Sequence, residues 1–394
     1  MNLQETLAEV LSEPRDPTGE FDRIADPTRN PVLILGTGHL GQWSLAALRQ
    51  AGIRPPAFCD NNSRLWGTTI SRLPVLPPAE ALARYPGAAV VVAVYNSTAP
   101  QDQLRGLGCK RVVPYPVLFW QHWQFMPRED RLELPHCILA RAADMPAGYD
   151  LLEDEASRRE FCAQIRWRCL LDYKCLPAPT DPREMYYAPD LFALRPDERF
   201  VDCGAFDGDS IRAFLERSAG RFDHIYAWEA DTMNLSSLHR YLDSLEPSVK
   251  QRVTVLPYAV ARENGTLRFS AEGLVGSRVD ETGEEVECRS LDSALAGCNP
   301  TLIKMDIEGA EPEALQGARE TMARCRPVMA VCAYHKCDHL WLLPQLLKAA
   351  NPDYRIFLRR YAEDCWETVY YAVPPERPTL TTPTRTAEAR SLFP

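Results

Sequence analysis

The chain has 394 residues, a length that favours two or more domains over one. Its 45% hydrophobic and 25% charged residues are typical of globular proteins and exclude a wholly disordered chain. With 44 Lys and Arg against 54 Asp and Glu, the net charge of −10 argues against a general electrostatic attraction to nucleic acid or anionic lipid. Because no run approaches the ~18 apolar residues of a membrane span and the first residues lack a secretion signal, we expect a cytoplasmic protein without membrane insertion.

The first part of the chain predicts a Rossmann-like domain. Residues 1–30 are polar and rich in proline, and we interpret them as a lead-in. From residue 31 onward, apolar runs alternate with helical segments, in the order strand, helix, strand, and then a further strand and helix. This order predicts an α/β domain over residues 31–123 that binds a nucleotide or a partner.

A glycine pattern follows the first strand of this domain. Gly36, Gly38 and Gly41 have the G-x-G-x-x-G spacing, and Asp60 stands at the end of the second predicted strand. This is the context of a dinucleotide-binding fingerprint, so these four residues form a candidate second nucleotide site. No residue suited to hydride transfer follows, which favours a binding role over a dehydrogenase.

The rest of the chain predicts a connector, a second α/β domain and a tail. Residues 124–198 contain one helical stretch and a Pro-rich passage, which indicates a connector. Strands and helices alternate again over 199–373, and the loop between the last two strands is too short for a crossover helix. The last strand of this second Rossmann-like sheet is therefore expected to be antiparallel. Residues 374–394 have the composition of a disordered tail.

The second domain contains an acidic turn with two glycines. The strand FVDCG carries Asp202 and leads through Gly204 and Gly208 into a helix. The glycines allow close approach of the backbone to a ligand, and the helix N-terminus supplies hydrogen-bond donors. Acidic residues here suit the ammonium and sulfonium of S-adenosylmethionine better than a pyrophosphate. Glu229 follows the next strand, where a carboxylate can accept hydrogen bonds from both ribose hydroxyls.

Six motifs, in their order and spacing, resemble the FkbM family of S-adenosylmethionine-dependent methyltransferases. They are FVDCGAFDGDS, AWEAD, LPYAVARENGTLRF, the GSR of 276–278, TLIKMDIEGAEPEALQGA and the AYHK of 333–336. The resemblance covers residues 186–373 and implies a seven-stranded methyltransferase sheet and methyl transfer, usually to a hydroxyl oxygen. The cofactor residues that it implies are Asp202, Gly204, Phe206, Gly208, Glu229, Ala230, Ala259 and Val260.

Methyl transfer to oxygen needs a group that removes the proton of the acceptor. His335 follows a predicted strand at its carboxyl end, on the rim where open α/β sheets bind ligands. We therefore predict His335 as the general base and Asp306 as a second catalytic residue that orients the base or the acceptor. Ser277, Arg278 and Glu308 are predicted to contact the acceptor.

The sequence does not favour a metal site. Cys332, His335, Cys337 and His339 are zinc-type ligands, but Cys332 lies in a predicted buried strand and the four do not form two separated pairs. Asp306, Glu308 and His335 leave open a Mg²⁺ or Mn²⁺ site, an interpretation that we rank below the general base.

The expected function is that of an S-adenosylmethionine-dependent O-methyltransferase. The acceptor would be a small molecule or a sugar-containing one, such as a glycoconjugate precursor. The alternatives are a non-catalytic nucleotide-binding or scaffold protein, and an NAD-dependent oxidoreductase that uses Gly36, Gly38 and Gly41.

Overall fold

The computed structural model describes residues 2–12, 17–126, 131–270, 278–279 and 284–378. Contacts divide the chain into two compact units, each built from three segments. The first contains Met1–Pro182, Val331–Ala349 and Ile356–Tyr370, and the second contains Arg183–Ala330, Ala350–Arg355 and Tyr371–Pro394. The domain boundaries expected from the sequence follow element order along the chain and stay predictions.

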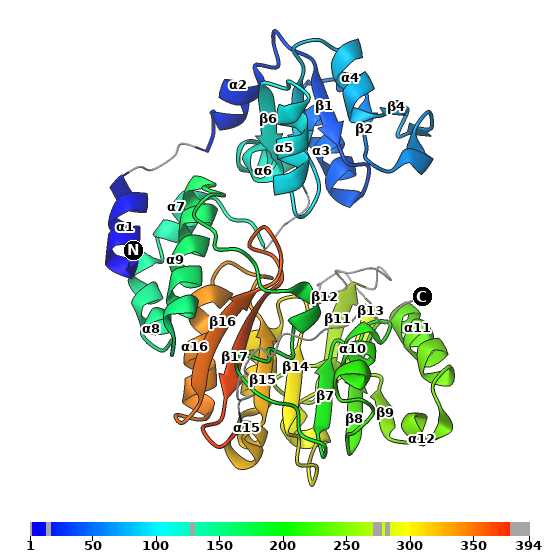
Figure 1. The fold of residues 1–394 in the computed structure, drawn as a ribbon, viewed down its shortest axis with the longest axis vertical. Helices are drawn as coiled ribbons and strands as arrows, with labels where there is room; N and C mark the ends of the chain where they lie inside the picture. The colour runs from blue at the N-terminus through cyan, green and yellow to red at the C-terminus, as the bar shows by residue number, and fades with distance from the viewer. Residues whose placement is uncertain (1, 13–16, 127–130, 271–277, 280–283, 379–394) are drawn as a thin grey trace, which may run out of the picture. The chain divides into compact units, whose positions relative to one another are not determined.

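The first unit contains a six-stranded sheet in the order β3-β4-β2-β1-β5-β6 (Figure 1). Its strands are β1 (Val32–Leu35), β2 (Phe58–Cys59), β3 (Thr69–Ile70), β4 (Leu73–Leu76), β5 (Ala89–Val92) and β6 (Arg111–Pro114). All neighbouring pairs are parallel except β3 with β4. Strands β1 and β5 are buried on both faces, which explains why their sequences are continuously apolar.

The helices of the first unit differ widely in length. They are α1 (Leu3–Ser12), α2 (Glu20–Ala25), α3 (His39–Gln50), α4 (Pro78–Arg84), α5 (Thr98–Gly106), α6 (Tyr115–His122), α7 (Pro135–Leu139), α8 (Met145–Tyr149), α9 (Glu155–Leu170) and α16 (His339–Ala350). Helix α9 begins at a capped end, since the Asp154 side chain accepts a hydrogen bond from the Ser157 amide.

A seven-stranded sheet has the order β16-β17-β15-β14-β7-β8-β9. Its strands are β7 (Arg199–Cys203), β8 (His224–Trp228), β9 (Val253–Leu256), β14 (Leu302–Met305), β15 (Val328–Cys332), β16 (Arg355–Arg360) and β17 (Thr368–Val373). Strand β7 pairs in parallel with both β8 and β14. Strands β16 and β17 are neighbours joined by a short loop, which makes them an antiparallel hairpin. The predicted α/β class and the seven-stranded sheet with an antiparallel strand are confirmed.

The second unit contains a four-stranded sheet in the order β10-β13-β11-β12. Its strands are β10 (Ala259–Val260), β11 (Gly265–Ser270), β12 (Arg278–Val279) and β13 (Glu284–Arg289). The helices of this unit are α10 (Asp209–Arg217), α11 (Thr232–Asp243), α12 (Pro247–Lys250), α13 (Leu291–Ala294), α14 (Glu311–Gln316) and α15 (Arg319–Cys325). Within the part of the chain that the structure describes, no helix is both long enough and apolar enough to cross a membrane.

The segment after β17 continues to pack against the second unit. Arg377 is buried and forms an ion pair with Glu198, which has no exposed surface. The Arg377 Nε also donates to the Ala193 carbonyl at 3.1 Å, and the Ala193 amide donates to the Pro378 carbonyl at 2.8 Å. The expected tail from 374 therefore begins with residues that are fixed in place, and 379–394 lie outside the described residues.

Candidate active site

The turn after β7 is fixed by contacts within the protein. Gly204 has φ +82°, and a Cβ at this position would lie 2.0 Å from the Asp306 carbonyl oxygen. Gly208 has φ +91°, and its Cβ would lie 2.4 Å from the Tyr241 ring. Both glycines are required because other segments of the chain approach them closely. The sequence had suggested a ligand as the reason for this close approach.

Asp202 lies beneath this turn and has no exposed surface. Its Oδ1 lies 3.0 Å from the Lys304 Nζ, and its Oδ2 accepts a hydrogen bond from the Ser210 hydroxyl at 2.5 Å. Lys304 also donates to the Gly204 carbonyl at 2.6 Å. Burial raises the pKa of the Asp202 carboxyl, and the Lys304 ammonium opposes this rise. Asp202 therefore supports the turn from inside the domain.

Glu229 connects the end of β8 to the turn after β7. Its Oε2 accepts a hydrogen bond from the Phe206 amide at 2.9 Å, and its Oε1 accepts one from the Asp231 amide at 2.8 Å. Phe206 has a positive φ of 48°, so this contact stabilises an unusual backbone conformation. Burial raises the pKa of the Glu229 carboxyl. Because each carboxylate oxygen has two lone pairs, both can still accept a ligand hydroxyl.

An apolar surface begins directly after Glu229. Ala230 is half-buried and packs against a small cluster that contains Ala259, Ala261 and Cys288. Val260, the partner of Arg289 in the β10–β13 pair, is also buried. The structure thus brings together the predicted ribose residue and the predicted adenine residues, although they come from separate strands.

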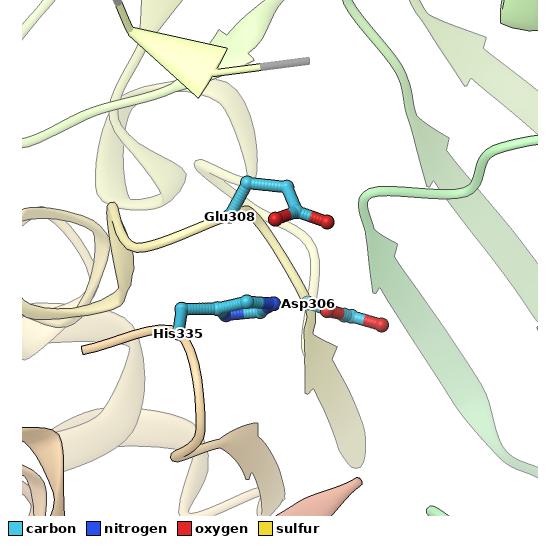
Figure 2. A group of neighbouring side chains, drawn as sticks. All are labelled: Asp306, Glu308 and His335. Carbon is cyan, nitrogen blue, oxygen red and sulfur yellow. The ribbon is translucent and has the colours of Figure 1, made fainter. Parts of the chain in front are cut away.

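Asp306, Glu308 and His335 form a second group of predicted site residues. Asp306 directly follows β14, and His335 comes three residues after β15, the neighbouring strand. Each of the three offers one ligand-type atom, and these atoms all lie within 4.8 Å of one another. Figure 2 draws these three side chains as sticks. His335 is buried, with 2% of its surface exposed, whereas the two acids are half-buried.

Tyr186 is a site residue that the sequence analysis missed. Its hydroxyl donates to the Asp306 Oδ2 at 2.8 Å, and its ring lies 5.3 Å from the Lys304 Nζ. Its backbone φ of +68° is unusual for a tyrosine, and its amide donates to the Tyr371 hydroxyl at 2.9 Å. Tyr186 and Tyr187 stand side by side in the Pro-rich passage, and this pair was the available signal. Because the passage was interpreted as a connector, neither tyrosine was considered as a site residue.

The structure describes the backbone of one of the two predicted acceptor residues in the GSR motif. Ser277 lies outside the described residues. Arg278 begins the short strand β12, where its backbone pairs with Ser270 of β11.

In the first unit, Asp60, the acidic residue of the glycine fingerprint, accepts hydrogen bonds from the surrounding loops. The Asp60 Oδ2 accepts hydrogen bonds from the Thr37 amide at 3.1 Å and from the Thr37 hydroxyl at 2.9 Å. Its Oδ1 accepts one from the Asn62 amide at 2.8 Å. A Cβ at Gly41 would lie 2.1 Å from the Gly36 carbonyl oxygen, whereas a Cβ at Gly38 would meet nothing within 4 Å. The close packing of Gly41 against Gly36 fits a dinucleotide-binding turn, but Asp60 already accepts hydrogen bonds from Thr37 and Asn62.

The fold matches that of a methyltransferase. The chain is similar to the crystal structure of a methyltransferase FkbM from Methylobacillus flagellatus KT, with a TM-score of 0.75 and 21% identity over 94% of this chain and 98% of that one. Residues 202–361 match the family model described as the methyltransferase FkbM domain.

Other solved structures are similar over about half of the chain. A precorrin-6y C5,15-methyltransferase from Geobacter metallireducens GS-15 has 13% identity, covers 49% of this chain and 87% of that one, and gives a TM-score of 0.32. An Aeropyrum pernix fibrillarin in complex with natively bound S-adenosyl-L-methionine has 12% identity, covers 49% and 76%, and also gives 0.32. No curated protein matches the chain in sequence.

Proposed function

We propose that this protein is an S-adenosylmethionine-dependent methyltransferase that methylates a hydroxyl oxygen of a small-molecule or sugar-containing acceptor. The observation that carries the proposal is the Glu229 carboxylate at the end of β8, bonded to the turn after β7 and followed by an apolar surface at Ala230 and Ala259. The match of residues 202–361 to the methyltransferase FkbM domain supports the same conclusion.

The residues around this turn fit the parts of the cofactor. Glu229 would accept hydrogen bonds from the ribose hydroxyls, and Ala230, Ala259 and Val260 would lie against the flat adenine. Phe206 and the turn from Gly204 to Gly208 would surround the methionine part. When bound, the cofactor supplies a methyl group on a positively charged sulfur.

The reaction is an in-line displacement. The acceptor oxygen bonds to the methyl carbon, the carbon–sulfur bond breaks, and its electron pair stays on the sulfur of S-adenosylhomocysteine. The hydroxyl proton must leave the acceptor, and holding both partners in line contributes much of the rate. Asp306 and Glu308 follow strand β14, and His335 follows strand β15. We assign to these residues the tasks of holding the acceptor and assisting the removal of this proton.

An oxidoreductase role for the first unit has less support. In a dinucleotide site the acid at the end of the second strand is needed for a ribose hydroxyl. Here the Asp60 Oδ2 accepts hydrogen bonds from both the amide and the hydroxyl of Thr37, which use its two lone pairs, and its Oδ1 accepts one from the Asn62 amide. Each oxygen of Glu229, in contrast, accepts one hydrogen bond from a backbone amide. A binding or interaction role for this unit remains part of the proposal.

Calorimetric titration with S-adenosylmethionine and with NAD tests the proposal. We expect one equivalent of S-adenosylmethionine to bind, and Glu229→Gln to weaken its binding by about 1–3 kcal/mol, because a charged acceptor is lost from the ribose. Glu216→Gln, which changes an exposed carboxylate on α10, is the matched control and should bind normally. Binding of NAD without S-adenosylmethionine, or normal binding by a folded Glu229→Gln protein, would contradict the proposal.

A further inference from the structure

A small cavity in the first unit lies beside helix α9, which packs against α7 (Figure 1). It encloses about 190 Å³, part of which is open to solvent, and in this structure it is too narrow to hold a water molecule. Most of its lining is apolar, and Ile138 of α7, Trp167 of α9 and Leu171 are examples. One fully charged side chain of α9, Arg168, also lines it. All the lining residues belong to the first unit.

Arg168 is a buried positive charge, with 4% of its surface exposed. A guanidinium keeps its proton at any pH at which proteins fold. Its Nη1 donates to the Arg131 carbonyl at 3.0 Å and to the Cys337 Sγ at 3.2 Å. Within the described part of the chain, its Nε and Nη2 have no hydrogen-bond partner. The side chain is therefore anchored through one nitrogen and leaves the other two available.

The two available nitrogens of Arg168 form one edge of the guanidinium. The Nε–H and Nη2–H bonds point the same way, and this edge is a fork that can donate to both oxygens of one carboxylate. Because the cavity is too narrow for water, water does not satisfy these donors here. A buried charge with unsatisfied donors is costly. This edge of Arg168 therefore suits an anion.

The side chains beside Arg168 do not neutralise it. Glu133 also lines the cavity, but its carboxylate forms an ion pair with Arg141. Burial raises the pKa of the Cys337 thiol to about 11, so this thiol is uncharged at neutral pH. The charge of Arg168 is thus available to an anion that comes from outside the described lining.

We propose that this cavity binds the carboxylate of a small organic acid, with its two oxygens on the Nε and Nη2 of Arg168. The apolar lining would contact the hydrocarbon part of the acid. Inorganic phosphate fits less well, because apolar walls leave several of its oxygens without donors. The volume of about 190 Å³ is below the ~300–1,000 Å³ of ordinary ligand pockets, so the acid has few carbon atoms, and the lining side chains must move apart to admit it. This site is separate from Glu229 and goes beyond the proposed methyl transfer.

Calorimetric titration with acetate, butyrate and benzoate tests the site, with neutral butyramide for comparison. We expect one equivalent of at least one acid to bind and butyramide not to bind. Arg168→Met keeps the length of the side chain but removes its charge, and it should weaken binding of the acid at least about tenfold. Arg159→Met, which changes an exposed arginine of the same helix, is the matched control and should bind the acid as the wild type does.

Thermal melts give a second measurement and establish that each variant folds. The acid should raise the melting temperature of the wild type and of Arg159→Met, but not that of Arg168→Met. If Arg168→Met does not fold, Arg168→Lys keeps the charge without the fork and should weaken binding at least about threefold.

The proposal is overturned if no acid binds at tens of millimolar, if butyramide binds as well as the acids, or if phosphate binds in their place. Binding of the acid that is unchanged in folded Arg168→Met or Arg168→Lys also overturns it. S-adenosylmethionine should bind normally to all of these variants, because Glu229 belongs to the other unit. That titration therefore reports on the proposed function independently of the acid site.

Discussion

Asp364, in the loop between β16 and β17, is a buried acid whose carboxylate accepts hydrogen bonds from Ser97. Its Oδ2 accepts a hydrogen bond from the Ser97 amide at 3.2 Å, at the N-terminus of α5. The Ser97 hydroxyl in turn accepts one from the Gln101 Nε2 at 3.0 Å. Burial raises the pKa of the Asp364 carboxyl from 3.8 to about 6, more strongly than the Ser97 amide lowers it.

We predict that this group makes folding more favourable at acidic pH. Because its pKa is raised in the folded state, the stability that it contributes is complete below pH 3.8 and is lost as the pH rises through about 6. Asp364→Asn removes this titration. Its free energy of unfolding relative to wild type should therefore improve by up to about 3 kcal/mol between pH 4 and pH 7. Denaturant unfolding of both proteins at several pH values measures the difference, and a constant difference would contradict the assignment.

At the scale of single residues, the sequence predicted where a side chain lies when its residue follows a strand closely along the chain. Glu229, Asp306 and His335 each follow an apolar run, and the structure places them at strand ends. The burial of Asp202 could not be predicted in this way. It depends on the register that pairs Asp202 with Lys304, a residue from a strand a hundred positions later.

At the scale of elements, the two glycines of the fingerprint turn have different roles. Gly41 lies in α3, and a Cβ there would overlap the Gly36 carbonyl oxygen at 2.1 Å, so the helix and the turn would have to separate. We predict that Gly41→Ala destabilises the protein by about 2 kcal/mol or more. Gly38→Ala meets nothing within 4 Å and should change stability by less than about 1 kcal/mol.

Thermal melts of the two variants provide the comparison. Both should bind S-adenosylmethionine as the wild type does once folded, because the fingerprint turn and Glu229 belong to different units. Equal melting temperatures for Gly41→Ala and Gly38→Ala would contradict this account of the turn.

Helix α9 shows why the expected connector could not be interpreted from its sequence. Its Gln164 donates to the Thr368 hydroxyl at 2.8 Å, and its Glu160 accepts from the Arg360 Nε at 2.7 Å. These partners lie about 200 residues later in the chain, and no local pattern signals them. Most residues of α9 are buried in the structure. The sequence of the helix alone does not reveal this burial, because it does not show which later residues pack against the helix.

At the scale of the whole molecule, the ion pair of Arg377 with Glu198 attaches the end of the described chain. We predict that Arg377→Ala lowers the free energy of unfolding by about 3–5 kcal/mol, because it leaves the Glu198 charge buried without its partner. Chemical denaturation measures this loss. The double variant Arg377→Met with Glu198→Gln should recover part of it, since neither buried charge remains.

The neighbouring residue supplies the matched control. Glu376 pairs with Arg326 at 3.0 Å, but its side chain is 58% exposed. Glu376→Ala should therefore cost less than about 1 kcal/mol. A loss as small for Arg377→Ala as for Glu376→Ala would show that the C-terminal segment is not attached through this pair.

The first unit consists of three segments that are far apart in the sequence, and this arrangement affects the order in which its parts can fold during synthesis. Its hydrogen bonds join Ser97 to Asp364 and Glu160 to Arg360, so early and late parts of the chain complete one another. A ribosome releases the N-terminal residues long before residue 360 is translated. The strands of the first sheet all lie between residues 32 and 114 and can pair early. Ser97 and α9, in contrast, lack their late partners until nearly the whole polypeptide has been synthesised.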